Sequence, residues 1–294
     1  MRTVYLGTSD FAVAVLERLA ASPHRPALVV TRPDRPRGRG RHVTPPPVAI
    51  AARELGIDLD QPASVNDEEA RARIAQAAPD VVCVCAFGAL IKEELLSAHH
   101  MLNVHPSLLP RWRGAAPVER AIMAGDPTTG VSIMAVTAGL DSGPVCLQQT
   151  EPIEPHDTYG TLAERLSRIG GDLLVRALDE RPPCVEQDDT QATYAEKITA
   201  ADRELDPRRP AAELERAVRA LTPHIGAHVT LPDGSLLGVR EARVGSDENV
   251  PAGTVSFDGP VPVLGCADGP LELVVVQPPG KRPMRGEDYL RGRR

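Results

Sequence analysis

An asparagine and a histidine two positions apart are the first residues whose types suggest chemistry. Asn103 and His105 end the segment 101–105, which we predict to be a β-strand. Alternate residues of a strand share a face, so both side chains point the same way, at the end where open α/β sheets bind ligands. An amide stabilises an oxyanion and an imidazole moves protons near neutral pH, so the pair suits acyl-type transfer. The alternative is a strand that simply ends in polar residues.

Asp141 is the third candidate. It lies between Gly139 and Gly143 in a loop that follows the predicted strand 130–136. A carboxylate in such a loop could reach His105 and orient it, as carboxylates do for catalytic imidazoles. The alternative is an ordinary turn residue, since aspartate beside glycine is common in turns.

The elements that must position these residues alternate between strand and helix. We predict strands at 3–6, 27–31, 81–85, 101–105, 130–136 and 145–151, and helices at 11–21, 48–55, 66–77, 118–124 and 158–178. Asn66 is the expected cap of the third helix. This order is typical of a parallel α/β sheet. The first turn carries only one glycine, Gly7, which argues against a dinucleotide fingerprint.

The C-terminal part has a different pattern. After a predicted helix at 211–221, short apolar runs are separated by turns such as Pro232-Asp233-Gly234. The predicted strands are 227–231, 236–243, 253–257, 261–264 and 271–277. This spacing predicts a small β-barrel domain. A proline-rich, polar passage around 181–193 indicates a boundary before it.

Positive charge is concentrated in two segments of an acidic chain. The 294 residues carry a formal net charge of −7, yet residues 32–42 hold five arginines and one aspartate. The tail, 281–294, holds six basic and two acidic residues. Two separate basic segments favour a large anionic partner such as nucleic acid. The alternative for 32–42, which we predict to be a loop without regular structure, is a solvated basic surface.

The cysteines indicate a reducing compartment. Their number is odd, five, and no paired CxxC motifs occur, which argues against a disulfide framework and a zinc ribbon. Cys83 and Cys85 lie in an apolar strand, where cysteine usually acts as a small hydrophobe. The sequence has no secretory leader and no apolar run of about 18 residues. We therefore expect a cytoplasmic protein without a membrane span.

A possible ligand surface follows the strand 81–85. Phe87, Gly88 and Leu90 combine apolar side chains with accessible backbone amides, between which a flat ligand could bind. Simple core packing of Phe87 and Leu90 is the alternative.

These motifs together resemble the methionyl-tRNA formyltransferase family, over nearly the whole chain. The strongest match is residues 103–117, Asn-Val-His-Pro-Ser-Leu-Leu-Pro-Arg-Trp-Arg-Gly-Ala-Ala-Pro, with Gly139-Leu140-Asp141-Ser142-Gly143. This part is shared by the wider folate-dependent formyltransferase superfamily. The resemblance to the tRNA-specific members rests on 7–13, 31–41, 192–198 and 277–284.

The resemblance implies a fold, a reaction and a set of contacts. It implies a Rossmann-like formyltransferase domain at 1–188, a linker at 189–206 and an OB-like β-barrel, tRNA-binding domain at 207–294. The formyl donor is 10-formyltetrahydrofolate, the acceptor is methionyl initiator tRNA, no metal is required, and we expect a monomer. Asn103 and His105 stabilise the oxyanion, and Asp141 orients His105. The implied folate contacts are Ser107, Leu108, Leu109, Pro110, Phe87, Gly88 and Leu90. The implied tRNA contacts are Arg35, Arg37, Arg39, Arg41, Lys281 and Arg282.

Two other functions compete with this one. The first is formyl transfer to a sugar amine or a small nucleotide, which would not need two distant cationic segments. The second is a non-enzymatic RNA-binding adaptor on the same fold. The presence of Asn103, His105 and Asp141 argues against the adaptor.

Overall fold

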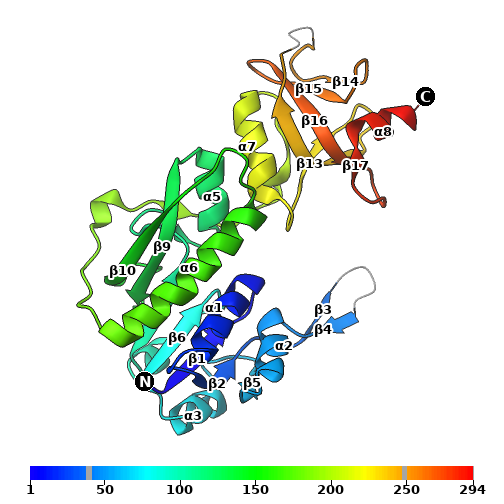
Figure 1. Cartoon of the computed structure of the whole chain (residues 1–294). Helices are drawn as coiled ribbons and strands as arrows, with labels where there is room; N and C mark the ends of the chain where they lie inside the picture. The colour runs from blue at the N-terminus through cyan, green and yellow to red at the C-terminus, as the bar shows by residue number, and fades with distance from the viewer. Residues whose placement is uncertain (38–41, 247–249, 294) are drawn as a thin grey trace. The chain divides into compact units, whose positions relative to one another are not determined.

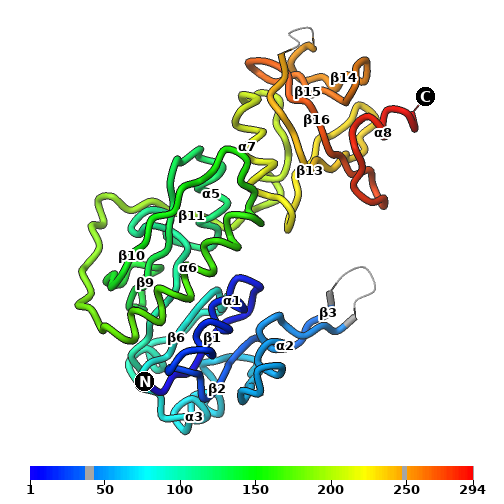
Figure 2. Tube along the Cα trace, in the orientation of Figure 1, coloured from blue at the N-terminus to red at the C-terminus, as the bar shows by residue number. Residues whose placement is uncertain are grey.

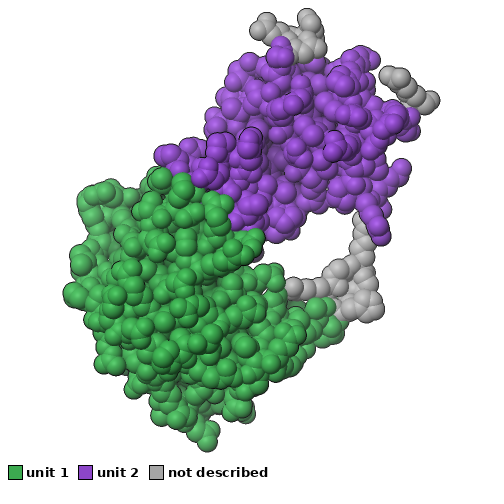
Figure 3. All heavy atoms as spheres, in the orientation of Figure 1, with its two compact units in different colours: residues 1–114, 128–152, 163–194 green, residues 115–127, 153–162, 195–294 purple. Residues whose placement is uncertain are grey.

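The computed structural model describes residues 1–37, 42–246 and 250–293. The chain forms two compact units, shown in different colours in Figure 3. Unit 1 contains residues 1–114, 128–152 and 163–194, and unit 2 contains residues 115–127, 153–162 and 195–294. The C-terminal unit therefore includes two segments from earlier in the chain.

A mostly parallel sheet forms the centre of unit 1 (Figure 1). Its strands are β1 (Thr3–Gly7), β2 (Pro26–Val30), β5 (Leu59–Asp60), β6 (Val81–Cys85), β7 (Met101–His105), β9 (Thr128–Ala135) and β10 (Val145–Pro152). They are arranged in the order β10-β9-β7-β6-β1-β2-β5, and only the pairs β7–β9 and β9–β10 are antiparallel. Every residue of β1 and β6 is buried, which explains their continuous apolar sequences. The predicted α/β class is confirmed.

Helices of unit 1 pack close to this sheet. They are α1 (Asp10–Ala20), α2 (Pro47–Glu54), α3 (Glu68–Gln76), α4 (Glu93–Leu96) and α6 (Tyr159–Glu180), whose first turn belongs to unit 2. Gly170 lets α6 approach β7, because a Cβ at this position would lie 2.8 Å from Val104 Cγ1. The helices α1 and α6 run side by side (Figure 2), joined by an ion pair between Arg18 and Asp172.

A short hairpin corrects one sequence prediction. Residues 32–42 are not a loop throughout, because β3 (Arg35–Arg37) pairs antiparallel with β4 (His42–Thr44). Arg35 lies opposite Thr44 in this register. Both Arg35 and Val43 are exposed, so the hairpin lacks the alternation of buried and exposed side chains that marks a strand in sequence.

Unit 2 is built on an antiparallel sheet and the helices α5 (Pro117–Ala124), α7 (Ala211–Leu221) and α8 (Gly286–Arg291). Its strands are β12 (Ala227–Thr230), β13 (Leu236–Val244), β14 (Val255–Ser256), β15 (Val263–Gly265), β16 (Pro270–Gln277) and β17 (Met284–Arg285). The helix α7 packs against β13 and against α5. The predicted β-rich C-terminal part is confirmed, whereas the basic tail contains a helix, α8, which its charge pattern did not indicate.

Short elements occupy the passage between the two parts of the sequence. They are the strands β8 (Arg113–Gly114) and β11 (Tyr194–Ala195), which pair with each other, and the 3-10 helices η1 (Asp189–Gln191) and η2 (Ala201–Arg203). Much of the predicted linker 189–206 is therefore hydrogen-bonded structure. The domain bounds 1–188 and 207–294 stay a prediction.

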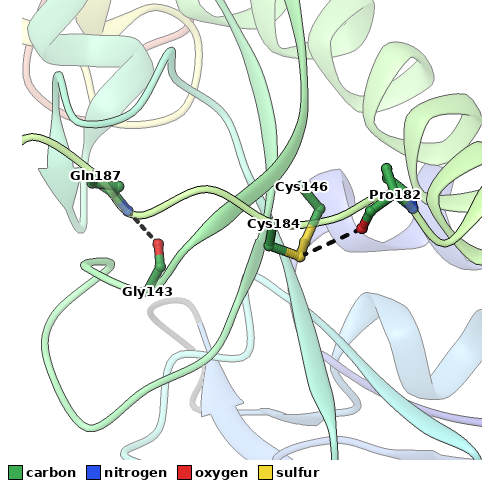
Figure 4. The surroundings of a disulfide bond; sticks show 5 residues. All are labelled: Gly143, Cys146, Pro182, Cys184 and Gln187. Atoms are coloured by element: carbon green, nitrogen blue, oxygen red, sulfur yellow. Dashed lines mark hydrogen bonds between the residues drawn. A yellow bond between two sulfur atoms is a disulfide. The ribbon is translucent and has the colours of Figure 1, made fainter.

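A disulfide joins Cys146 of β10 to Cys184 (Figure 4). The expectation from the cysteine pattern is wrong for this pair. Val145 and Val185 exchange both backbone hydrogen bonds, at 2.8 and 2.9 Å, so the next residue pair lies in the closer, non-hydrogen-bonded position of an antiparallel ladder. The two cysteines are 38 positions apart, and no local pattern reveals such a pairing.

The sheet also buries Cys83 and Cys85, as predicted. Within the described residues, no helix has both the length and the apolar character needed to cross a membrane.

Candidate active site

Asn103 and His105 lie at the carboxyl end of β7, in the middle of the unit 1 sheet. The strand β7 runs between β6 and β9, with Asn103 opposite Met134 and His105 opposite Ser132 of β9. His105 is 4% exposed, and Asn103 is half-buried. The strand end therefore presents a shielded imidazole beside an amide that is partly open to solvent.

Both ring nitrogens of His105 face protein groups. Nε2 lies 2.9 Å from the backbone carbonyl oxygen of Trp112. A carbonyl only accepts hydrogen bonds, so Nε2 carries the proton and donates it to this bond. Nδ1 lies 3.7 Å from Oδ2 of Asp141. The imidazole thus lies between a carbonyl, to which it donates a hydrogen bond, and a carboxylate.

Asp141 is held in place by the backbone of Gly114, which donates a hydrogen bond of 2.9 Å to Oδ2. Its φ of +46° is in the left-handed region, which aspartate adopts more readily than most residues. The structure therefore brings together the three residues that the sequence placed on two separate segments.

The loop after β7 is fixed by one buried hydroxyl. Ser132 Oγ of β9 donates to the carbonyl oxygen of Ser107 at 2.6 Å and accepts from the Leu109 amide at 3.1 Å. Gln148 of β10 donates to the Leu109 carbonyl at 2.8 Å. Ser107 is fully buried, and its own hydroxyl donates to the Arg111 carbonyl. Among the predicted folate contacts, Ser107 therefore has a hydroxyl that is already engaged within the loop.

The loop after β6 lies beside this one, because β6 and β7 are parallel neighbours. Phe87 is 5% exposed and packs in the core, so the core-packing alternative holds for it. Leu90, in contrast, is 75% exposed. The Gly88 carbonyl accepts a hydrogen bond of 3.1 Å from Arg32. Leu90 is thus a large apolar side chain that is exposed to solvent in the loop after β6.

Asn66 holds the same loop, which corrects its predicted role. The residue at the start of α3 is Asp67, and the Asn66 side chain bonds the loop instead. Its Nδ2 donates to the Leu90 carbonyl and its Oδ1 accepts from the Lys92 amide, both at 2.8 Å. The sequence could not distinguish this contact from a helix cap, because asparagine serves both.

The predicted basic contacts lie on both units. Arg35 is exposed on β3 of unit 1, and Lys281 and Arg282 are exposed in the turn between β16 and β17 of unit 2. Arg37 ends β3, while Arg39 and Arg41 lie outside the described residues. Their contacts with nucleic acid stay predictions.

Cys83 and Cys85 are unsuited to nucleophilic chemistry. Burial raises the pKa of the Cys83 and Cys85 thiols to about 12, so they carry no thiolate at neutral pH. Across residues 1–37, 42–246 and 250–293, no three histidine, cysteine or carboxylate side chains come together as a metal site.

Two protein-family models match this chain. The family model described as "Formyl transferase" matches residues 1–178, and "Formyl transferase, C-terminal domain" matches residues 197–294. The chain belongs to the formyl transferase family. Both family domains are present, in the expected order.

Two relatives extend the formyltransferase match over the whole chain. A methionyl-tRNA formyltransferase of Ectopseudomonas mendocina (strain ymp) is 41% identical over 300 residues, covering 100% of this chain and 95% of its own. One from Halorhodospira halophila (strain DSM 244 / SL1) is 42% identical over 304 residues, covering 100% and 96%. This formyltransferase is therefore similar to those enzymes from end to end.

Solved structures share the formyltransferase fold at lower identity. HypX from Aquifex aeolicus, in complex with tetrahydrofolic acid, has a TM-score of 0.67 and 17% identity over 99% of this chain. The match covers 47% of HypX, so the chain spans about half the length of that protein. An N-formyltransferase from Helicobacter canadensis has a TM-score of 0.66 and 14% identity, covering 92% of this chain and 98% of its own.

Proposed function

We propose that this protein transfers the formyl group of 10-formyltetrahydrofolate to the α-amine of methionine on initiator tRNA. Full-length similarity to methionyl-tRNA formyltransferases at about 41% supports the substrates. The observation that carries the reaction type is the arrangement at the end of β7, where Asn103 lies near His105 and His105 Nδ1 is 3.7 Å from Asp141. An amide donor, an imidazole and a carboxylate placed next to one another can promote acyl transfer to an amine without a metal.

Each of the three residues has a separate proposed role. In the part of the chain that the structure describes, no protein group hydrogen-bonds the Asn103 side chain, so its N–H groups are free to stabilise an oxyanion. His105, whose Nε2 donates to the Trp112 carbonyl and whose Nδ1 faces Asp141, assists departure of the folate nitrogen by moving a proton. Asp141 uses Oδ2 for Gly114 and His105, which leaves Oδ1 to accept the proton of the attacking amine through water.

We propose that the folate donor binds at the surface formed by the two loops. Exposed Leu90 offers an apolar contact for a flat ring, and the Ser107–Pro110 loop is already ordered by Ser132. We propose that Leu90, Leu108 and the backbone of these loops hold the donor, which supplies the formyl carbon. Leu109, Pro110, Phe87 and Gly88 shape the same surface.

Formation of formylmethionine tests this function. The purified protein is incubated with 10-formyltetrahydrofolate and methionyl initiator tRNA, and formylmethionine is measured after deacylation. We expect product with the wild type, none with uncharged tRNA, and a loss of at least about 100-fold for Asn103→Ala or His105→Ala. His100→Ala is the matched control, because His100 is an exposed histidine next to the same strand. No product, with an amino sugar formylated instead, would overturn the assignment.

Cationic side chains of unit 2 provide a second test of the substrate. Lys281 and Arg282 are both exposed, and we propose that they contact tRNA phosphates. Their double alanine variant should raise the KM for tRNA and leave the KM for the folate unchanged. The slope of log K for tRNA binding against log salt concentration should fall by the equivalent of about one to two phosphate contacts. Arg243→Ala is the control, since Arg243 is an exposed arginine already paired with Glu272. An equal effect of both variants would contradict a local contact. Cytoplasmic location and a monomeric state also stay predictions.

A further inference from the structure

The segment 184–189, here called the strap, is attached along the edge of the unit 1 sheet. Cys184 is bonded to Cys146 of β10, and Val185 exchanges two backbone hydrogen bonds with Val145. Cys184 itself is exposed. Figure 4 shows that the strap then continues from the disulfide to Gln187, whose amide points toward Gly143. The strap thus leads from a covalent anchor to the loop that contains Asp141.

Gln187 uses all the hydrogen-bonding positions of its side chain. Nε2 donates to the carbonyl oxygens of Asp141, at 2.9 Å, and Gly143, at 2.6 Å. Oε1 accepts from Arg113 Nε at 3.0 Å and from Nη2 at 2.8 Å. Arg113 is 3% exposed and precedes Gly114, whose amide binds the Asp141 carboxylate. The side-chain amide of Gln187 therefore connects the loop that contains Asp141 to β8, whose Gly114 amide binds the Asp141 carboxylate.

The Asp141 loop adopts a conformation that needs such support. Asp141 has a φ of +46°, which is unfavourable without compensating contacts. Gly143 passes so close to β9 that a Cβ there would lie 1.9 Å from the Ala135 carbonyl oxygen. The two carbonyls that flank this tight passage are the two that Gln187 binds. We propose that Gln187 is a positioning residue for Asp141, and that the Cys146–Cys184 disulfide fastens the strap that carries it.

This inference rests on the proposed function, and Gln187→Glu tests it most sharply. A glutamate keeps the size of the side chain and its bonds from Arg113. It places a carboxylate oxygen against the two carbonyls, so the donated bonds become repulsive contacts. We expect kcat, measured well below the Tm, to fall about 10- to 100-fold with both KM values near those of the wild type, and the Tm to fall because two carbonyls lose their donor. Gln191→Ala is the matched control, because Gln191 follows the strap and binds only the exposed Asp188.

A double-mutant cycle separates positioning from general stability. If Gln187 acts through Asp141, then Gln187→Glu lowers kcat in the wild type but has little further effect in an Asp141→Asn background. Full additivity of the two changes would overturn the proposal, as would wild-type kcat in Gln187→Glu. Absence of formylmethionine with the wild-type protein would instead refute the proposed function, so the two failures are distinct.

Reduction of the disulfide tests the second half of the proposal. Dithiothreitol breaks the bond between the two Sγ atoms; each sulfur gains one electron and one proton, and the reagent is oxidised to its cyclic disulfide. We expect kcat to fall about two- to tenfold once five free thiols are titrated in the denatured protein, in place of the three of the oxidised form. Cys184→Ser should match the reduced enzyme and show no response to dithiothreitol. An unchanged kcat with five titratable thiols would exclude the disulfide from this role.

Discussion

Ser132 provides the most quantitative test of how the sheet orders the candidate site. Its buried hydroxyl makes three hydrogen bonds at once, to the Ser107 carbonyl, the Leu109 amide and the Gln148 side chain. Ser132→Ala leaves the first two backbone groups without this partner inside the protein. A buried, unsatisfied group costs about 1–3 kcal/mol, so two of them should lower the free energy of unfolding by about 2–6 kcal/mol.

Urea unfolding followed by circular dichroism measures this loss. Ser167→Ala is the matched control, because Ser167 is also buried but its hydroxyl donates to the Glu164 carbonyl within α6. That carbonyl is part of a helix, so we expect the control to change by less than about 1 kcal/mol. The same Ser132 variant should raise the KM for 10-formyltetrahydrofolate, since the 107–110 loop loses its anchor.

One result would refute this reasoning about the loop. If Ser132→Ala unfolded within 0.5 kcal/mol (roughly the scatter of surface changes) of the wild type, with an unchanged m-value, the hydroxyl would not be the element that orders the loop. A destabilised variant with an unchanged KM would separate the loop's order from donor binding.

Three further predictions concern other described contacts. Hydrogen bonding by Arg120 lowers the pKa of Asp202 to about 2, below about 3.9 in the unfolded chain. Asp202→Asn should therefore lower the unfolding free energy by about 1 kcal/mol at pH 7, and urea titrations should show this difference vanishing from pH 4 to pH 2. Asn66→Ala should raise the KM for the folate about fivefold at constant kcat, because its loop loses two hydrogen bonds. Cys184→Ser should lower the unfolding free energy by about 2–4 kcal/mol without reductant, since the closed loop links residues 38 positions apart.

Each of these has a contradicting result. A difference for Asp202→Asn that is as large at pH 2 as at pH 7 would exclude the carboxylate charge as its cause. An Asn66→Ala enzyme with lowered kcat and normal KM would place that loop in the chemical step. Equal stability of Cys184→Ser and the oxidised wild type would show that the cross-link adds nothing to folding.

The sequence predicted best those elements whose signal is local. The strands 81–85 and 101–105 and the helix 211–221 were predicted with the bounds that the structure shows. A buried parallel strand is apolar throughout, and an amphipathic helix repeats its apolar residues, so either can be recognised within one short window. Asn103 and His105 lie in such a strand and Asp141 in the loop after another, so the sequence could mark these polar side chains as candidates.

Contacts between distant segments could not be predicted in this way. Gln187 is one polar residue in a polar passage, and only the folded chain shows that it binds Arg113, 74 positions away. The same holds for Ser132, which looks like any serine in a strand, and for the pairing of Cys146 with Cys184. The pairing of β3 with β4 was missed because Arg35 and Val43 are both exposed. The residue types at these positions are determined by neighbours that are distant in the sequence, so they produce no periodic pattern along it.

The interleaved make-up of unit 2 has a consequence for synthesis on the ribosome. The helix α5 leaves the ribosome before α7, against which it packs, and 87 positions separate Ala124 from Ala211. At a synthesis rate of about 5–20 residues per second, the apolar face of α5 remains without α7 for on the order of 4–17 s. Met123 of α5, which packs on the unit 2 core in the folded protein, is one of the side chains that remain unpacked during this time. The nascent chain therefore exposes the apolar face of α5 until α7 has been made, and the translation speed between these helices sets how long this exposure lasts.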